Sequence, residues 1–371
     1  MSIEPLVGVR VRQCGGATET YLTARPMAPG DAQEQAASLL QSVLAALPGD
    51  ASILQERYFG TQPALAAMAS LRKDALDGRV DGVEPTWLLT PPNSQGPISG
   101  VQIHALSGCP RPAVLSVAGR PCGRLVEFGD NRYLVGCDLQ ADTDGPPERQ
   151  ARAMLLKAED LVTQAGGSLA DVVRTWMWLG GILDWYDPFN RVRSELFAAR
   201  GLMPADGTGH LPASTGIGIG PSGGRACTMD FCAVLGDARP RFLLGAGKQG
   251  PASSYGSAFS RAAVAQTPGG TTVYVSGTAA IDASGVTTHI GDIRGQIADT
   301  LTNVLSVLSD ASCRGEDVVH AIAYCKTPEV EQAFRQISGS LPIPHLVAIA
   351  DVCRDNLLFE VEATAMPSGE Q

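Results

Sequence analysis

The sequence is poor in the features that define several large classes of protein. Aromatic residues make up 5% of its 371 residues, and no apolar run reaches the length of about 18 residues that predicts a membrane-spanning helix. Its start lacks the charged and apolar segments of a signal peptide. Positive charge is also scarce, with 28 Lys and Arg against 38 Asp and Glu. Because the net charge of −10 repels nucleic acid and anionic lipid, we expect a cytoplasmic protein that binds neither.

Paired metal ligands are missing too. The nine cysteines are scattered without a Cys-X-X-Cys pair, and the five histidines lack the spacing of a metal site. The glycine-rich stretch GIGIGPSGG (216–224) lacks the Lys-Ser/Thr pair of a phosphate-binding loop, and we expect a strand and hairpin there. These absences predict reduced thiols, no metal and no other cofactor.

What the sequence does contain is an internal repeat. NRYLVGCDLQADTDG (131–145) resembles TTVYVSGTAAIDASG (271–285). An amphipathic helical stretch follows each, and then Asp-Val-Val, at 171–173 and at 317–319. A second helical stretch and a closing strand complete each copy. Repetition on this scale predicts two like units packed on one another, with a ligand cleft at the seam.

Patterns typical of strands and helices alternate inside each copy. In the second copy, β-branched residues at 272–276 predict a strand, and the apolar face of 292–308 predicts a helix. A sheet with two helices across one face is an α+β layer. We therefore expect an α+β protein with two such units in tandem, 126–237 and 238–371, behind an irregular N-terminal extension, 1–125.

The N-terminal extension is weakly patterned. Helix-like stretches occur at 31–46 and 63–76, and the loops between them and the first repeat are rich in Gly and Pro. The apolar run at 112–118 predicts a strand. We expect this strand to pack the extension onto the first unit.

The second repeat resembles the RidA/YjgF family. The segments that carry the resemblance are YVSGTAAID (274–282), DVVHAIAYCKTPEVEQAF (317–334), LPIPHLVAIADVC (341–353) and LFEVEA (358–363). In that family the corresponding segments surround a pocket for a small acid. His345 stands where the family has an arginine that holds the carboxylate of an imine substrate. That departure argues against simple imine deamination.

Two such units behind an N-terminal extension resemble the chorismatases. The local features are YDPFNRVR (186–193), LPASTGIG (211–218), ASSYGSAFSR (252–261) and ADVCRDNLLFEVE (350–362). The resemblance covers most of the chain from about Asn131 onward. It implies chorismate as the small-molecule substrate, with loss of the enolpyruvyl group as pyruvate.

Cleavage of chorismate requires a proton donor. An enol ether is inert at neutral pH until its methylene carbon is protonated, and a carboxylic acid kept neutral by burial can supply that proton. Glu360 and Glu362 face the same side of the closing strand. By pattern alone they fit a polar sheet face in water equally well. The resemblance implies that Glu360 is the catalytic acid.

The two carboxylates of chorismate require cationic partners. Tyr186, Asn190 and Arg193 are spaced i, i+4, i+7, which places them on one stripe of a helix. Arg261 follows Tyr255 in a glycine-containing loop. A solvated helix face and a surface arginine are the alternatives. The planar fork of arginine suits these partners because it donates two hydrogen bonds to one carboxylate. The resemblance implies that all five residues, Tyr186, Asn190, Arg193, Tyr255 and Arg261, bind substrate.

Three further residues come from the resemblance. It implies that Ser214 and Gly277 bind substrate and that Cys353 is catalytic. In the resemblance, Cys353 with Gly277 at a strand end marks the type that forms 3-hydroxybenzoate, with some 4-hydroxybenzoate as a possible by-product. A lone cysteine is otherwise most often a small buried hydrophobe. Three alternatives stay open: hydrolysis to a dihydroxycyclohexadiene carboxylate, an imine or enamine hydrolase of RidA type, and a non-catalytic binder of small acids. The sequence leaves the oligomeric state undetermined.

Overall fold

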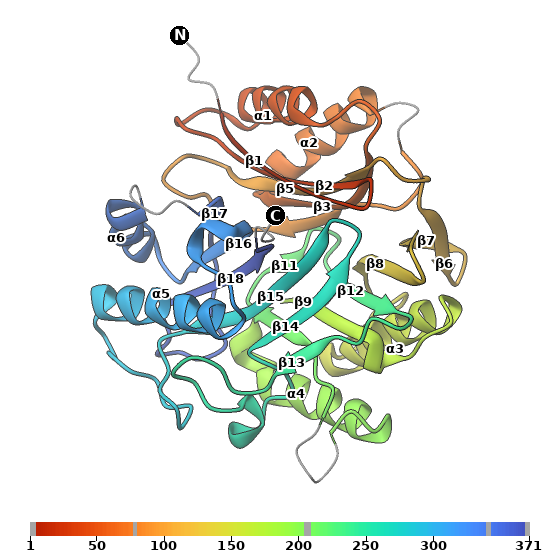
Figure 1. Cartoon of the computed structure of the whole chain (residues 1–371). Coiled ribbons are helices and arrows are strands. Elements are labelled where there is room, and N and C mark those ends of the chain that lie inside the picture. The colour runs from red at the N-terminus through yellow and green to blue at the C-terminus, as the bar shows by residue number, and fades with distance from the viewer. Residues whose placement is uncertain (1–4, 77–79, 204–208, 339–342, 368–371) are drawn as a thin grey trace.

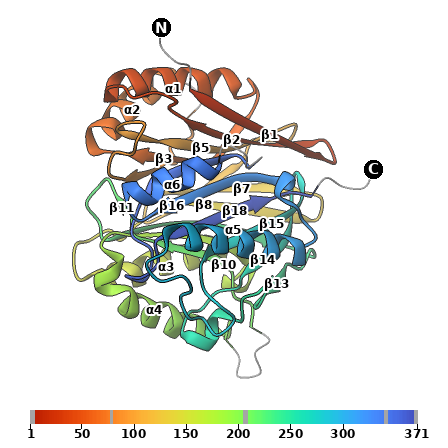
Figure 2. The ribbon, with the colours of Figure 1, turned by 90° about the vertical axis from the view of Figure 1, so that its left-hand side faces the viewer.

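Three six-stranded sheets form the centre of the molecule, and two helices cover the outer side of each (Figure 1). The computed structural model describes residues 5–76, 80–203, 209–338 and 343–367. Seen from the side, the N-terminal unit forms one layer and the other two units lie beneath it (Figure 2). The predicted α+β class is confirmed, and so is the tandem of two like units.

The middle unit begins before the predicted boundary at 126. Its sheet has the order β10-β9-β12-β8-β7-β6, so β6 and β7 belong to it, and residue 126 lies inside β7. The predicted strand at 112–118 is present as β6. In chain order its elements are β6 (Ala113–Val117), β7 (Arg120–Phe128), β8 (Asn131–Leu139), α3 (Pro147–Gln164), β9 (Val172–Leu179), α4 (Ile182–Ala199), β10 (Ala213–Ile217) and β12 (Cys227–Leu235).

The C-terminal unit repeats this arrangement strand for strand. Its order is β13-β14-β15-β18-β16-β17, which corresponds to β6-β7-β8-β12-β9-β10 when the middle sheet is read from its other edge. The strand predicted at 272–276 lies within β15, and the helix predicted at 292–308 is α5. In chain order its elements are β13 (Arg241–Leu243), β14 (Ala262–Thr267), β15 (Gly270–Ala279), α5 (Ile293–Asp310), β16 (Val318–Cys325), α6 (Pro328–Ser338), β17 (His345–Ile349) and β18 (Phe359–Ala365).

The N-terminal region is a third unit of similar design, and the prediction of an irregular extension is wrong. Its sheet has the order β1-β2-β5-β3-β4-β11, with the two-residue β11 (Gly220–Pro221) contributed by the middle unit. In chain order its elements are β1 (Leu6–Cys14), β2 (Ala17–Arg25), α1 (Ala32–Ala46), β3 (Ser52–Gly60), α2 (Gln62–Ala75), β4 (Thr86–Leu89) and β5 (Ile98–Ser107).

Buried polar residues explain why this third unit was hard to recognise. Its strands place Glu19, Arg57, Gln102 and His104 in the interior, each less than 5% exposed. These side chains interrupt the apolar pattern from which a strand is predicted. The polar inner face packs against the other two sheets; Gln102, for example, donates to the carbonyl oxygen of Ala321 at 3.0 Å.

The inner faces of all three sheets share one core. It includes Phe59 from the N-terminal unit, Tyr133 and Trp176 from the middle unit, and Tyr274 and Tyr324 from the C-terminal unit. Separate apolar clusters lie between each sheet and its helices. Because each unit buries both faces of its sheet, the seams between units are interior, and a cavity at a seam is shielded from water.

Candidate active site

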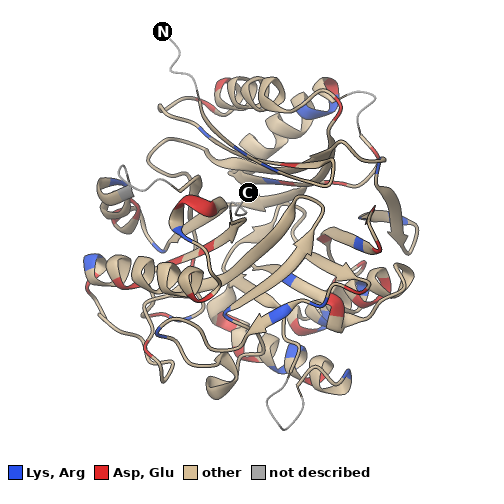
Figure 3. Cartoon of the chain, viewed as in Figure 1, with Lys and Arg blue, Asp and Glu red and all other residues tan. Residues whose placement is uncertain are grey.

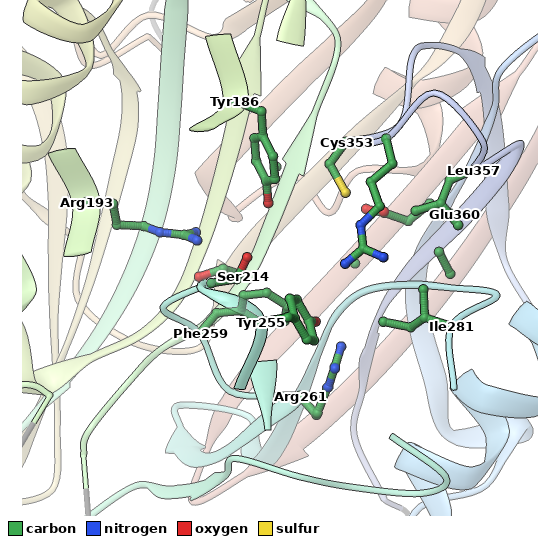
Figure 4. Close-up of a pocket in the computed structure, with 15 residues that line it drawn as sticks. Tyr186, Arg193, Ser214, Tyr255, Phe259, Arg261, Ile281, Cys353, Leu357 and Glu360 are labelled. Atoms are coloured by element: carbon green, nitrogen blue, oxygen red, sulfur yellow. The ribbon is translucent and has the colours of Figure 1, made fainter. Parts of the chain in front are cut away.

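A cavity lies at the seam between the middle and C-terminal units (Figure 4). Backbone contacts close this seam: Ala213 at the start of β10 forms a bridge with Ser260, and Gly218 forms one with Asp351. Eight of the nine residues proposed from the sequence line the cavity: Tyr186, Arg193, Ser214, Tyr255, Arg261, Gly277, Cys353 and Glu360. The predicted cleft between units is therefore present, and it gathers residues from distant parts of the chain.

Glu360 presents a buried carboxyl group to the cavity from β18. It is 5% exposed and lies opposite Tyr324 of β16 and Ala279 of β15. Burial, reinforced by the nearby charge of Glu362, raises the pKa of Glu360 to about 8. At neutral pH this carboxyl therefore carries a proton, as a general acid requires.

Gly277 faces the carboxyl of Glu360 at close range. It lies at an irregularity in the pairing of β15 with β18. A Cβ atom at this position would be 2.2 Å from Oε1 of Glu360, nearer than any real contact. The absence of a side chain at Gly277 is therefore what allows the Glu360 carboxyl to occupy its place.

Helix α4 supplies two residues to the opposite wall. It contains Pro188, and a non-helical residue, Trp185, interrupts its first turns. Tyr186 and Arg193 both reach the cavity, as the i, i+7 spacing predicts. Asn190 does not line the cavity. Instead, its Oδ1 accepts a hydrogen bond from Nη2 of Arg193 at 2.7 Å, so it orients the guanidinium.

Arg261 precedes β14 and is buried beneath Tyr255. Its Nε and Nη2 donate to the carbonyl oxygen of Gly250 at 3.0 and 2.9 Å. Its guanidinium carbon lies 5.5 Å from the ring centroid of Tyr255 and 5.4 Å from that of Phe259. These contacts fix the side chain, and burial lowers the pKa of Arg261. The alternative of a surface arginine is excluded by its 1% exposure.

Arg354 is a third arginine of the cavity, and the sequence analysis missed it. Its Nη1 donates to the carbonyl oxygen of Gly285 at 2.6 Å, and its guanidinium carbon lies 5.3 Å from the Tyr255 ring. The available signal was its position next to Cys353 in ADVCRDNLLFEVE. Apolar side chains complete the wall near it, among them Ile281 and Leu357.

Cys353 and Ser214 lie on different sides of the cavity (Figure 4). Burial raises the pKa of Cys353 to about 12, so its thiol stays protonated and is a poor nucleophile. The hydroxyl of Ser214 lies 2.7 Å from that of Thr175, and its backbone N–H donates to Oγ of Ser276 at 2.8 Å. Ser214 therefore helps to join the two units as well as lining the cavity.

The charges around the cavity do not balance. Within the described parts of the chain, none of Arg193, Arg261 and Arg354 forms an ion pair. Nε of Arg193 is buried without a hydrogen-bond partner. The carboxyl that shares the cavity, Glu360, is neutral at pH 7 because its pKa is raised. The site is thus locally cationic in a chain of net charge −10, in which acidic and basic positions are otherwise interspersed (Figure 3).

His345 does not line this cavity. It begins β17, where its Nδ1 lies 2.7 Å from the carbonyl oxygen of Ile343 and its ring packs edge-on against Phe334. Burial lowers its pKa, which favours a neutral ring. His345 therefore does not replace the missing arginine as an anion-binding cation here.

Two kinds of feature are absent from the described residues. No helix among them combines the length and the apolarity needed to cross a membrane. In the same residues, no group of three or more His, Cys, Asp or Glu side chains is arranged to hold a metal ion.

These features define an α+β protein in which similar sheet-and-helix units enclose a cavity lined by arginines and a buried glutamate at a seam. Consistent with this, residues 253–367 match the sequence profile of the family described as Endoribonuclease L-PSP. No curated protein sequence gave a significant match.

Among solved structures, the chain is similar to that of a chorismatase. The two are 19% identical, with a TM-score of 0.63 over 98% of this chain and 100% of the other. At this identity the match establishes a common fold, so this chain has the fold of that chorismatase. A putative endoribonuclease from Thermotoga maritima is 23% identical, with a TM-score of 0.29. The alignment includes 35% of this chain and 98% of the other chain. A YjgF-family protein from Neisseria meningitidis (14% identical, TM-score 0.28) covers 35% with 97% of its own.

Proposed function

We propose that this protein is a chorismatase that converts chorismate to 3-hydroxybenzoate and pyruvate. The observation that carries the proposal is a neutral, buried Glu360 in one cavity with three arginines, none of which forms an ion pair with a described residue. Chorismate has two carboxylates and an enol ether, so it needs both cationic contacts and a proton donor. The shared fold with a chorismatase supports the same substrate class.

The arginines bind the two carboxylates and thereby orient the ether toward Glu360. Arg193 and Arg261 come from different units and enter the cavity from different sides (Figure 4). Each has a fixed partner, Asn190 or the Gly250 carbonyl, which holds its fork in place before substrate arrives. Such preorganisation lowers the entropic cost of binding. Arg354 adds a third donor on the side of Cys353.

Glu360 starts the reaction by transferring its proton to the methylene carbon of the enolpyruvyl group. The oxocarbenium ion that results withdraws electrons from the ether bond to the ring. The ring hydroxyl then attacks the adjacent ring carbon, and the ether bond breaks with its electron pair going to the departing pyruvate. The hydroxyl proton returns to Glu360, and the arene-oxide-like product rearranges to the phenol. No water is consumed, and chorismate is divided completely between the two products.

Cys353 and Gly277 favour attack by the tethered hydroxyl over attack by water. Gly277 allows the Glu360 carboxyl to lie flat against β15. The protonated thiol of Cys353 fills space near the reacting ether that a nucleophilic water would otherwise occupy. A tethered nucleophile has a large effective concentration, so excluding an ordered water is enough to direct the reaction.

The cavity contains about 550 Å³ of empty space including its mouth, which lies within the range of small-molecule sites.

A product assay tests the proposal. Purified protein is incubated with chorismate in the presence of a metal chelator, and the aromatic acids and pyruvate are resolved by chromatography. We expect equal amounts of 3-hydroxybenzoate and pyruvate. If a dihydroxycyclohexadiene carboxylate formed in place of 3-hydroxybenzoate, chorismate would still be the substrate, but the proposed product would be refuted. Unchanged chorismate would refute both, and an imine substrate would then be tested.

A further inference from the structure

A buried ion pair lies directly behind Glu360. Glu362 is two residues further along β18, on the same face of the strand. Its Oε2 accepts a hydrogen bond from Nη2 of Arg174, on β9 of the middle unit, at 2.8 Å. Their side chains are 4% and 1% exposed, so water screens this pair very little.

The ion pair is tied to the strand end that carries Gly277. Nη2 of Arg174 also donates to Oγ1 of Thr215 at 2.6 Å, and the same oxygen accepts from the backbone N–H of Gly277 at 3.1 Å. The network therefore crosses the seam twice and joins β18 and Gly277 of the C-terminal unit to β9 and β10 of the middle unit. Its position depends on both units.

The groups that face Glu360 come from several elements. Glu362 on its own strand is negative, whereas Arg174 on β9 and Arg261 before β14 are positive. Tyr186 of α4 and Cys353 are close enough to interact with it electrostatically, but their pKa values are raised and both are neutral. Burial is the main cause of the raised pKa of Glu360, and Glu362 is the negative group that adds to it.

We propose that Glu362, with its carboxylate paired to Arg174, is a positioning residue whose negative charge disfavours the ionised form of Glu360. The inference rests on the proposed role of Glu360 as the acid. A like charge nearby disfavours the ionised form of a carboxyl. Arg174 makes this arrangement possible because its positive charge offsets the cost of burying Glu362.

The test measures the protonation of Glu360 directly, in protein without substrate. Infrared difference spectra taken across a pH titration report the carbonyl stretch of a protonated carboxyl, and Glu360→Gln identifies the band that belongs to Glu360. In Glu362→Gln we expect the midpoint of this band to fall by about one to two pH units, as for a removed charge at this range. An unchanged or raised midpoint would overturn the inference.

Asp230→Asn is the matched control. Asp230 is the corresponding acid of the middle unit: it lies opposite Trp176 as Glu362 lies opposite Ile322, and it pairs with Arg57 at 2.8 Å. This variant loses an equally buried ion pair but no charge beside Glu360. We expect its midpoint to equal that of the wild type. A shift as large as that of Glu362→Gln would mean that general loosening of the fold, and not local charge, moves the titration.

A second variant applies if Glu362→Gln does not fold. Arg174→Gln removes the cation that offsets Glu362, so we expect the Glu360 midpoint to rise. A fall or no change would contradict the inference. The titration uses no chorismate, so its failure can be told apart from a failure of the proposed function. If chorismate is not consumed but the midpoints move as stated, the proposed function fails and the role of Glu362 stands.

Discussion

Two seams of the molecule use the same sheet positions for different purposes. One sheet position can be compared in all three units. In the C-terminal unit it is Glu360, which lies opposite Tyr324. In the middle unit it is Thr228, opposite Trp178, and in the N-terminal unit it is Gly100, opposite Phe59. At the seam of the middle and C-terminal units this position holds an acid that faces a cavity. At the seam of the N-terminal and middle units it holds Thr228, whose hydroxyl donates to Asp138 at 3.0 Å.

The buried acid at the seam of the N-terminal and middle units is Asp230, and several donors hydrogen-bond to its carboxylate. Asp230 accepts hydrogen bonds from the side chains of Gln55, Arg57 and Thr86 and from the backbone of Asp138, at 2.6 to 3.0 Å. Those partners stabilise its carboxylate and hold the two units together. No such set of donors surrounds Glu360 among the described residues, and burial raises its pKa instead. Whether a buried carboxyl is structural or reactive depends on its partners, and the fold alone does not decide it.

The largest expected effect comes from removing the acid. Glu360→Gln keeps the size of the side chain but cannot donate a proton to carbon, so we expect turnover of chorismate to fall by ~10²–10⁴-fold. Binding should change little, because the arginines are untouched. Steady-state kinetics and titration with chorismate measure the two effects separately.

Thr228→Val, at the counterpart position of the other seam, is the control. It should leave turnover close to the wild-type value. If Glu360→Gln kept more than a tenth of the wild-type rate, Glu360 would not be the acid, and Glu362 would be tested as the donor. Loss of activity in Thr228→Val would mean that the two seams are not independent.

The arginines should give the next largest effect. Arg193→Ala and Arg261→Ala each remove a cation from a buried site that binds a carboxylate, at an expected cost of ~2–5 kcal/mol in transition-state stabilisation. Lysine should restore little at either position, because it lacks the planar fork. The measurement is kcat/KM for chorismate.

Arg57, which is paired with Asp230 at the other seam, provides the contrast. Arg57→Lys should lower the free energy of unfolding without a comparable loss of kcat/KM. Unchanged kinetics in Arg193→Ala or Arg261→Ala would show that the arginine in question does not bind substrate.

Gly277 and Cys353 should alter the course of the reaction. A methyl group at Gly277 collides with Oε1 of Glu360, so Gly277→Ala should slow chorismate loss by roughly tenfold or more as the carboxyl is displaced. Cys353→Ala opens space for water and should change mainly the ratio of 3-hydroxybenzoate to dihydroxycyclohexadiene carboxylate. Chromatography of the products, with isotopically labelled solvent water to trace oxygen into pyruvate, measures both. A wild-type ratio in both variants would refute the proposed control of the product.

The last expected effect is on stability. The folded protein keeps the Glu360 proton up to a pKa of about 8, whereas an unfolded glutamate loses it near its ordinary value of 4.5. Folding is therefore increasingly opposed as the pH rises through that window. Glu360→Gln removes this penalty and should be more stable than the wild type by roughly 2–4 kcal/mol at about pH 9, with almost no difference near pH 4. Urea unfolding at both pH values tests it, and an equal difference at both would contradict the raised pKa.

The sequence determined the repeat, the α+β class and most of the cavity. The repeated motifs and the period of 292–308 reflect local geometry, which a sequence displays directly. Eight of nine proposed residues line the cavity, mainly because the chorismatase resemblance selected them; spacing alone left Arg261 open as a surface residue. Asn190, which was predicted to bind substrate, contacts Arg193 and does not line the cavity.

Only the tertiary structure showed that the N-terminal region is a third unit, because its strands bury polar residues whose partners lie in the other units. Arg57 and Asp230 are 173 positions apart, and neither predicts the other. The same holds for Arg354 in the cavity and for Arg174 behind Glu360. The pKa of a carboxyl depends on its burial and on charges within a few ångströms, and those neighbours are brought together only when the three sheets pack.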